Sequence, residues 1–439
     1  MHIVQLTDFF NPVIGGLERH VETLSRELIG LGHTVTVLTL QTGDDPAEET
    51  MDGVRVIRFA GWSGGRTAFH ADAARPFHPP VPDPGAMTVL RRVIQRERPD
   101  VVHSHSWLQY SYFPFYHAQR GPAHVVTLHD HGLACAKKTF EQATSLRPRA
   151  GESPLSDPST DHMPRQCSGP RLMKCLACAP EQFGVLKGAA ITTGLRASRV
   201  LHKRADRYIA ISRAVADGSR PALPGRSDVV VIPTLIPNHL RALASSTPRP
   251  TFLPPDDGYL MFVGALGRHK GVDVLLEARR RMRNRLPMVL IGTPRADTPR
   301  IEDPDIAIAH NVPSAQVMAS WTRASIAVVP SVCREGMGQV AIEAMLTGRP
   351  VVASDIGGLR DVVEHSVTGL MVPPADPEAL ASALDTLVDD PLARQRMGEA
   401  GRLRARQFEA AVVVPRVVEV FEEVLRERAD KQLDLFDKT

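Results

Sequence analysis

Short runs of consecutive apolar residues alternate with segments of helical period along most of this chain. A continuous apolar run of four to eight residues indicates a strand buried on both faces, and its alternation with helices is typical of a parallel sheet. Leu17, Val21, Leu24 and Leu28 recur at helical spacing between the first two runs. The runs of the first half are His2–Leu6, Thr34–Leu40, Val101–His105 and Val125–Leu128.

The second half repeats the pattern. Its apolar runs are Tyr259–Gly264, Met288–Gly292, Ile326–Pro330 and Val351–Ser354. Helices are predicted after the first run, at Val272–Arg281, and after the third, at Gln339–Leu346. Two such series predict an α/β protein of two doubly wound Rossmann-like domains that face each other across a cleft.

The length of 439 residues also favours two domains over one core. We predict a first domain over residues 1–235, with a cysteine-containing insert at about 135–180. Prolines mark residues 236–255 as a linker, and the second domain then covers 256–411. An apolar stripe predicts a final helix over 412–430, followed by a loose tail at 431–439.

Composition excludes several classes of protein. Hydrophobic residues make up 43% and charged residues 23%, as in a globular protein, and a net charge of +3 is too small to indicate nucleic-acid binding. The chain starts directly in a strand and has no apolar run long enough to span a membrane, which favours a cytoplasmic protein. A basic helix predicted at residues 187–207 leaves peripheral contact with the inner membrane face open.

The stretch from Ile326 to Pro374 contains several residues suited to ligand binding close together in the sequence. A strand ends at Pro330, a loop with Glu335 and two glycines follows, and a helix carries Glu343. Open parallel sheets bind ligands at this edge, and glycines leave backbone N–H groups open to an anion or a polyol. Taken alone, the two glutamates are better explained as a helix cap and a solvated side chain than as a ligand site.

Two further features stand at predicted strand ends in the first half. Gly15 and Gly16 open the first helix, where a glycine pair is either a tight turn or an anion site. Histidines follow two strands, at His103, His105, His129 and His131, where each is either a structural, hydrogen-bonded side chain or part of a ligand site.

Four of the five cysteines, Cys135, Cys167, Cys175 and Cys178, fall in the insert. An odd number of cysteines without a secretion signal argues against a disulfide scaffold. Four thiolates that include a C-x2-C pair would close a structural zinc site and hold the loop Lys137–Pro170. Free buried thiols are the alternative.

The motifs around Glu335 resemble the nucleotide-sugar site of the family 4 glycosyltransferases of the GT-B fold. The segments that carry the resemblance are Glu335–Met345, Gly348–Ser354, Gly357–Gly358 and Gly369–Pro373. The resemblance implies a retaining transfer from a nucleotide diphosphate sugar (a UDP- or GDP-sugar) to an acceptor hydroxyl, and a final helix that crosses back to the first domain.

The resemblance also assigns roles to residues. His129 matches the histidine that the family places against the donor sugar, with His105 behind it, and Lys270 matches a lysine that clamps the donor diphosphate. The family's arginine in the same loop is replaced by Ala265, and we expect Arg268 to supply its charge. The residues implied to be catalytic are His129, Glu335 and Lys270. Those implied to bind the donor are Gly16, His105, Arg268, Lys270, Gly336, Met337, Gly338, Gln339 and Glu343.

No DxD-type pair is placed to hold a metal at the diphosphate, so metal-independent transfer without a cofactor is the better hypothesis. The acceptor is a polysaccharide, a lipid-linked glycan or a small metabolite, and the loops Trp62–Pro84 and Lys137–Pro170 are expected to select it. The alternatives are a catalytically silent nucleotide-sugar-binding scaffold, supported by Ala265, and a related sugar-nucleotide epimerase or phosphorylase.

Overall fold

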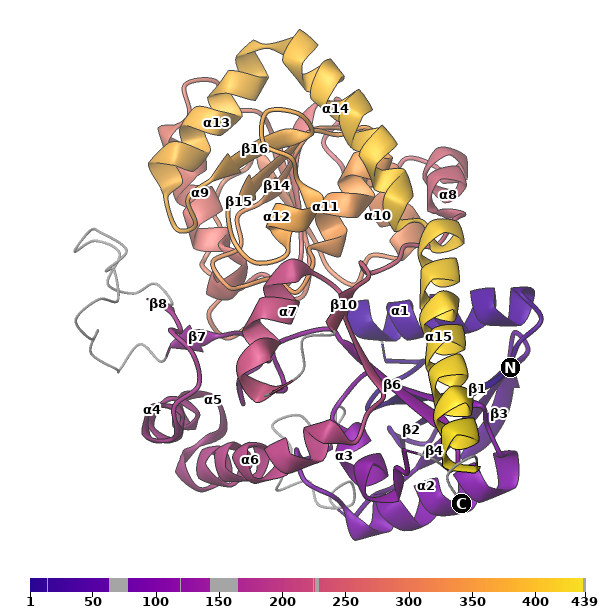
Figure 1. The fold of residues 1–439 in the computed structure, drawn as a ribbon. Coiled ribbons are helices and arrows are strands. Elements are labelled where there is room, and N and C mark those ends of the chain that lie inside the picture. Colours follow the sequence, from indigo (N-terminus) through magenta and orange to yellow (C-terminus); the bar gives the residue numbers. More distant parts are fainter. Residues whose placement is uncertain are drawn as a thin grey trace. The chain divides into compact units, whose positions relative to one another are not determined.

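The computed structural model describes residues 1–13, 15–62, 78–118, 120–142, 165–223, 225 and 229–436 (Figure 1). Most of the two loops expected to select the acceptor lies outside the described residues. The chain divides into two compact units. Unit 1 contains the described residues within 1–146, 167–235 and 410–439, and unit 2 contains residues 236–409 together with 165–166.

Unit 1 is built on an eight-stranded sheet with the order β10-β9-β6-β5-β1-β2-β4-β3. All neighbours are parallel except β3, which is antiparallel to β4. The strands are β1 His2–Thr7, β2 Thr34–Leu40, β3 Glu48–Met51, β4 Val54–Phe59, β5 Val101–Ser104, β6 Ala123–Leu128, β9 Arg207–Ala210 and β10 Val229–Val231. Two short strands, β7 Glu141–Gln142 and β8 Arg165–Gln166, lie outside both large sheets.

Alternate residues of the unit 1 strands build two cores on opposite faces. Ile3, Val35 and Val101 pack with helix α1 and the final helix α15, whereas Val4, Leu38 and Val102 pack with α2. Figure 1 shows α1 and α15 side by side. The α-helices of this unit are α1 Gly16–Gly30, α2 Pro84–Glu97, α3 Gln109–Tyr112, α4 Leu172–Cys178, α5 Pro180–Phe183, α6 Val185–Ala197, α7 Arg213–Ser219 and α15 Ala410–Phe436. The short 3-10 helices are η2 Phe113–Phe115, η4 Ser198–Lys203 and η5 Arg220–Ala222.

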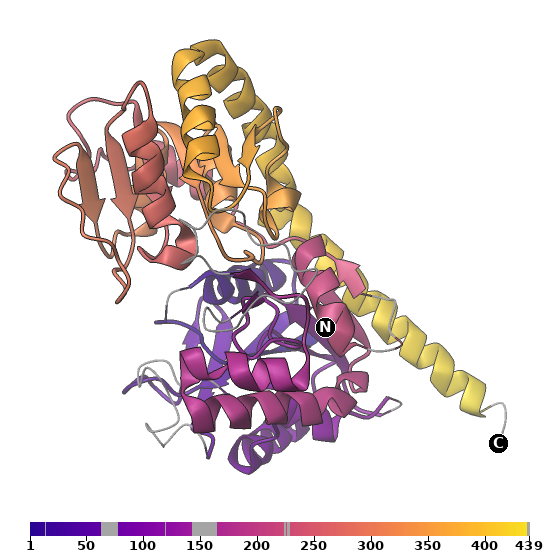
Figure 2. The same ribbon diagram turned by 90° about the vertical axis from the view of Figure 1, so that its left-hand side faces the viewer.

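Unit 2 has a six-stranded, fully parallel sheet with the order β13-β12-β11-β14-β15-β16. Figure 2 shows helices of this unit packed beside its strands. The strands are β11 Tyr259–Val263, β12 Met288–Ile291, β13 Ile306–Ala309, β14 Ala324–Val329, β15 Val351–Ser354 and β16 Gly369–Val372. The helices are α8 Leu240–Ser246, α9 Val272–Arg281, α10 Ser314–Trp321, α11 Gln339–Leu346, α12 Leu359–Val362, α13 Pro377–Asp389 and α14 Pro391–Ala405, with η6 Arg268–Lys270 and η7 Arg406–Phe408. Helices α9 and α13 share one core with the strands. Two parallel α/β sheets, one in each unit, are the fold class that the sequence predicted.

Three predicted boundaries need correction. The supposed linker 236–255 contains α8, whose Leu240 and Ala244 are buried, because these two apolar residues lie four positions apart on one helical face. Helix α15 runs to Phe436, so most of the predicted tail is helical. The predicted helix 187–207 ends at Ala197, continues as η4, and gives way to β9 at Arg207.

Candidate active site

The ends of three parallel strands form the candidate site of unit 2. Strand β11 is hydrogen-bonded to β14, and β14 to β15, all in parallel, so the segments that follow them meet at one edge of the sheet. The segment after β11 contains η6 with Lys270, and the segment after β14 contains Glu335. Topology thus brings together two predicted residues that lie 65 positions apart.

Lys270 and Glu335 form an ion pair in which the ammonium Nζ lies 2.6 Å from the carboxylate Oε1. The hydroxyl of Ser331 donates a second hydrogen bond to the same oxygen, at 2.5 Å. Burial alone raises the pKa of Glu335, but the charge of Lys270 and the two hydrogen bonds outweigh it and hold this pKa below its ordinary value. The carboxylate is therefore ionised at neutral pH. Both bonds end on Oε1, and Oε2 accepts no protein hydrogen bond in the described part of the chain.

Glycines fix the loop that carries Glu335, because neighbouring backbone comes too close for a side chain. A Cβ on Gly357 would lie 2.6 Å from the carbonyl oxygen of Glu335 and 2.7 Å from its nitrogen, and Gly357 has a positive φ of 58°. The N–H of Gly358 donates to the carbonyl of Glu335 at 2.8 Å. The glycine turn after β15 therefore holds the Glu335 backbone in place.

The other predicted donor-binding residues of unit 2 lie on the same two segments, in η6 and from Gly336 into α11. Arg268 is exposed, and its backbone N–H donates to Asp297 Oδ2 at 3.0 Å. Among the described residues, no backbone hydrogen bond outside helices and strands uses the N–H of Gly336, Met337 or Gly338. Gly338 is the left-handed N-cap of α11, which starts at Gln339 and carries the half-buried Glu343 in its second turn. The start of α11 thus presents N–H groups beside the ion pair.

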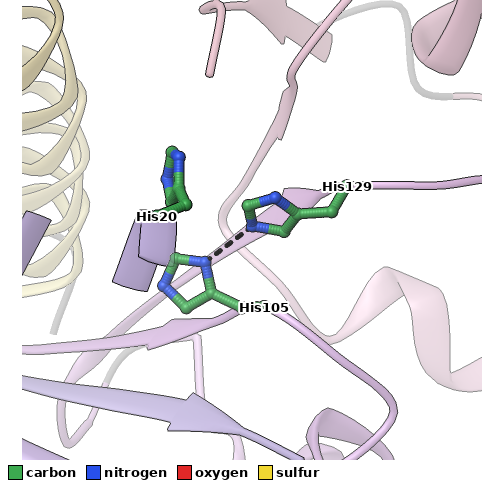
Figure 3. Close-up of side chains that lie close together, drawn as sticks. All are labelled: His20, His105 and His129. Carbon is green, nitrogen blue, oxygen red and sulfur yellow. Dashed lines mark hydrogen bonds between the residues drawn. The ribbon is translucent and has the colours of Figure 1, made fainter. Parts of the chain in front are cut away.

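Unit 1 has a comparable edge, occupied by histidines instead of charges. Strand β5 lies parallel between β1 and β6, and His105 and His129 directly follow β5 and β6. Figure 3 shows their rings together with that of His20, which comes from α1. The rings of His20 and His129 meet edge to face with centroids 4.7 Å apart.

A chain of hydrogen bonds fixes the histidine tautomers. Gln5 Oε1 lies 2.6 Å from His105 Nε2, so this nitrogen carries the proton and donates. His105 Nδ1 is then the acceptor, and it lies 3.0 Å from His129 Nε2, which must donate (Figure 3). The remaining nitrogen of His129, Nδ1, is left as an acceptor. Gln5 and His105 therefore position His129.

Burial keeps these three histidines neutral. Loss of solvation lowers the pKa of His20 to about 4, and it lowers those of His105 and His129 well below the ordinary value, as do the neighbouring rings. Within the described residues, this is the one group of three or more His, Cys, Asp or Glu whose potential metal-ligand atoms lie within 4.8 Å of one another. A metal bound by all three rings would have to break the His105–His129 bond. His103 is fully buried and bonds Thr127 Oγ1 at 2.7 Å, a structural role.

A pocket opens beside His105 and His129. Polar groups of Ser106, Gln109 and Asp130 contribute to its wall, and Lys138 Nζ lies 4.3 Å from the ring centroid of Trp107. The pocket offers hydrogen-bond donors and acceptors around the two histidines, as a site for a polyol requires.

Gly16 does not present an open helix N-terminus. It is the first residue of α1, and the carboxylate of Glu18 lies where a side chain on the preceding Gly15 would stand. An acidic residue in the first turn interacts favourably with the helix dipole, so Glu18 occupies the position that the sequence assigned to an anion. The prediction for Gly16 missed this competing carboxylate.

The four cysteines of the insert are free thiols close to one another. Burial raises the pKa of Cys135 to about 11, and the nearby Cys167 and Cys178 add to this effect. No three of the four sulfurs lie within 4.8 Å of one another, so the described geometry is wider than a loaded zinc site. The structural zinc stays a prediction.

Sequence reasoning missed Ser331, His20 and Gln5. Ser331 directly follows the proline that closes β14, so its position at a strand end was a usable signal. His20 lies inside an apolar helix and Gln5 inside a strand, and neither position differs from that of an ordinary core residue. Only the three-dimensional contacts reveal them.

Among the described residues, no helix is long and apolar enough to span a membrane. Two family models match the sequence, "Glycosyltransferase Family 4" over residues 14–161 and "Glycosyl transferases group 1" over residues 257–390. A glycogen synthase of Mycobacterium tuberculosis is 29% identical over 427 residues, which cover 92% of this chain and 90% of the relative. A D-inositol 3-phosphate glycosyltransferase of Thermobispora bispora is 27% identical, with coverage of 94% and 90%.

Solved structures show the same architecture. Sucrose-phosphate synthase of Thermosynechococcus elongatus matches with a TM-score of 0.67 and 20% identity, covering 97% of this chain and 99% of its own. HepE of Anabaena, solved in complex with UDP and glucose, matches with a TM-score of 0.61 and 16% identity, covering 96% and 100%. Together with the strand-end residues of both units, these matches show that the chain belongs to the family 4 glycosyltransferases of the GT-B fold.

Proposed function

We propose that this glycosyltransferase moves a sugar from a nucleotide diphosphate sugar to an acceptor hydroxyl, with retention of the anomeric configuration and without a metal at the diphosphate. The observation that carries the proposal is the Lys270–Glu335 pair, with an ammonium, an ionised carboxylate and open N–H groups at one strand edge. Relatives whose names include glycogen synthase and inositol phosphate glycosyltransferase support a sugar donor of this class.

In this proposal Lys270 and Arg268 compensate the charge of the leaving diphosphate, helped by the N–H groups before α11. Preorganised donors of this kind stabilise developing charge and replace the role of a cation. Glu335 Oε2 accepts a hydrogen bond from a sugar hydroxyl, because Oε1 is already used by Lys270 and Ser331. Glu343 accepts from the ribose diol.

His129 is proposed to contact the sugar through Nδ1, the nitrogen that the Gln5–His105 chain leaves without a proton. A neutral imidazole accepts a hydroxyl hydrogen bond there without adding charge. With retention, the leaving phosphate itself takes the proton of the acceptor hydroxyl, so no protein base is needed at that step. The acceptor is a polysaccharide, a lipid-linked glycan or a small metabolite.

Anomeric analysis of the product by NMR, with UDP- and GDP-sugars offered in turn, tests the proposal. We expect turnover that survives EDTA and a product with the anomeric configuration of the donor. An inverted product, or activity that EDTA abolishes and Mg²⁺ or Mn²⁺ restores, contradicts it. Nucleotide-sugar binding without turnover would indicate the silent scaffold, and epimerised or phosphorolysed sugar would indicate the other alternative.

The proposal includes peripheral contact with an anionic membrane surface through α4 to η4 of unit 1. Residues 171–204 contain seven Lys or Arg and one acidic residue. Met173, Val185, Leu186 and Val200 are each at least 73% exposed. Basic residues interleaved with exposed apolar side chains are typical of interfacial segments. Co-sedimentation with anionic vesicles should decrease in a Met173→Gln/Leu186→Gln double variant, and unchanged sedimentation would contradict this contact.

A structural zinc on Cys135, Cys167, Cys175 and Cys178 is proposed as the one metal of the protein, outside the reaction. Purified protein should contain about one zinc ion per chain by elemental analysis, and Cys175→Ser should lose it. Protein that is isolated without metal, and that takes up no Co²⁺ with sulfur-to-metal charge-transfer bands, contradicts the zinc site.

A further inference from the structure

A second pocket of unit 1, whose lining contains none of the site histidines, lies between the turn at Ala134–Ala136, helix α4 and helix α6. Figure 1 shows α4, α5 and α6 grouped at one edge of unit 1. The apolar part of the wall comes from Ala134, Ala136, Pro170, Leu172 and Leu195. The polar part comes from Arg171, Cys175, Thr192, Arg196 and Arg199.

Three arginines converge on this pocket without a counter-charge. Among the described residues, Arg171, Arg196 and Arg199 take part in no ion pair, and Glu181, the one acidic residue between residues 171 and 204, pairs with Lys137 at 2.6 Å. Guanidinium groups held together without an acid form a site for an anion with several oxygen atoms.

A buried hydroxyl on α6 points to the same ligand. Thr192 lines the pocket and is 5% exposed, yet its Oγ1 has no hydrogen-bond partner in the described structure. The adjacent Thr193 is exposed and donates to Ala189 O at 2.8 Å, the usual bond of a threonine inside a helix. A buried hydroxyl without a partner costs free energy, which a bound oxyanion would recover.

We propose that this pocket binds a phosphate group, held by the guanidinium groups of Arg171, Arg196 and Arg199 and by the hydroxyl of Thr192. The phosphate belongs either to a soluble phosphorylated molecule or to a lipid headgroup. The exposed apolar side chains of Met173 and Val200, each next to a pocket residue in the sequence, are suited to the second source.

The test uses two probes on the full chain. Inorganic phosphate, compared with sodium chloride at matched ionic strength, probes the soluble form by thermal shift. Phosphatidylcholine vesicles with and without phosphatidic acid probe the lipid form by co-sedimentation. The variants are Arg199→Gln, Arg196→Gln and Thr192→Val, and their matched controls are Arg92→Gln on α2 and Thr193→Val.

We expect at least one probe to bind, and each arginine variant to weaken its affinity roughly tenfold, the size of one charge-assisted hydrogen-bond contact. Thr192→Val should weaken it by a smaller factor, and the controls should bind like the wild type. The probe that binds identifies the source of the phosphate: inorganic phosphate indicates a soluble molecule, and phosphatidic acid indicates a lipid headgroup. Binding of neither probe, or equal binding by the pocket variants and their controls, overturns the proposal. UDP binding, measured in parallel, shows whether each variant is folded and tests the proposed function separately.

Discussion

The two units carry their functional residues at the same place in the fold but with opposite chemistry. In unit 2 the strand edge holds an ion pair, Lys270–Glu335, next to N–H groups that donate to no backbone carbonyl in the described loops. In unit 1 the corresponding edge holds neutral imidazoles joined by hydrogen bonds. A charged edge suits a diphosphate and a neutral edge suits sugar hydroxyls. The comparison teaches that similar sheets acquire different roles through the residues that directly follow their strands.

Reversing the charge of Lys270 should have the largest effect, and this effect should be specific to unit 2. Lys270→Glu places a second carboxylate next to Glu335 and removes the cation that we propose compensates the diphosphate charge. We expect UDP affinity to fall at least a hundredfold, about 3 kcal/mol. Isothermal titration calorimetry with UDP measures it, and His129→Ala in unit 1 is the matched control, expected to lower UDP affinity far less. Equal losses of UDP affinity in both variants would contradict the proposed difference between the two units.

The glycine turn that supports Glu335 gives the second test. Gly357→Ala combines a positive φ with a clash against the Glu335 backbone, and we expect a loss of about 2 to 3 kcal/mol in unfolding free energy. Gly32→Ala is the control, because Gly32 also has a positive φ, 84°, but open space around it. The control should lose about 1 kcal/mol. Urea unfolding measures both, and equal losses would show that the contact with Glu335 is unimportant.

Mild acid should destabilise unit 1 more than unit 2, because burial lowers the pKa of several histidines in unit 1 and that of His269 in unit 2. With His20 at a pKa of about 4 when folded and 6.5 when unfolded, the unfolded chain binds the proton first as the pH falls below 6.5. His20 alone then lowers the free energy of unfolding by about 2 kcal/mol at pH 5. The pKa of Glu335 is lowered in the folded protein. Its contribution to stability is therefore fully present above pH 4.5 and is lost only at lower pH.

Hydrogen exchange of peptides from each unit at pH 7 and pH 5, corrected for the intrinsic exchange rate, reports this difference. A His20→Gln variant should reduce the loss in unit 1. Equal destabilisation of the two units at pH 5, or no effect of the variant, would count against the assignment of neutral histidines.

The smallest expected effect concerns the positioning of His129. His105→Leu removes the acceptor that fixes the His129 tautomer, and we expect kcat to fall about tenfold with little change in KM for the donor. The acid limb of the kcat profile should also shift, because the neighbouring ring no longer influences His129. His103→Asn, at a buried histidine outside the chain of hydrogen bonds, is the control. A change confined to stability would leave His105 with a purely structural role.

Much of this organisation could be predicted from the sequence, for identifiable reasons. Continuous apolar runs identified both sheets, and the strand-end positions of Lys270, Glu335 and His129 followed from them. Contacts that join distant segments could not be predicted. The bond from Ser331 to Glu335 and that from Gln5 to His105 depend on side-chain directions that spacing does not encode. Helix α8 was not predicted, because the prolines around it indicated a linker. The position of Glu18 was not predicted, because a glycine pair was assumed to leave the start of a helix open.

The final helix has a consequence for how the protein is made. Val413, Val417 and Phe421 of α15 belong to the same core as Ile3, Leu24 and Val101, although the whole of unit 2 separates them in the sequence. During synthesis, the apolar side of α1 remains without this cover until α15 has left the ribosome, while unit 2 already has all of its strands. Premature termination after Glu409 would therefore yield a finished second half attached to a first half with an open, aggregation-prone face.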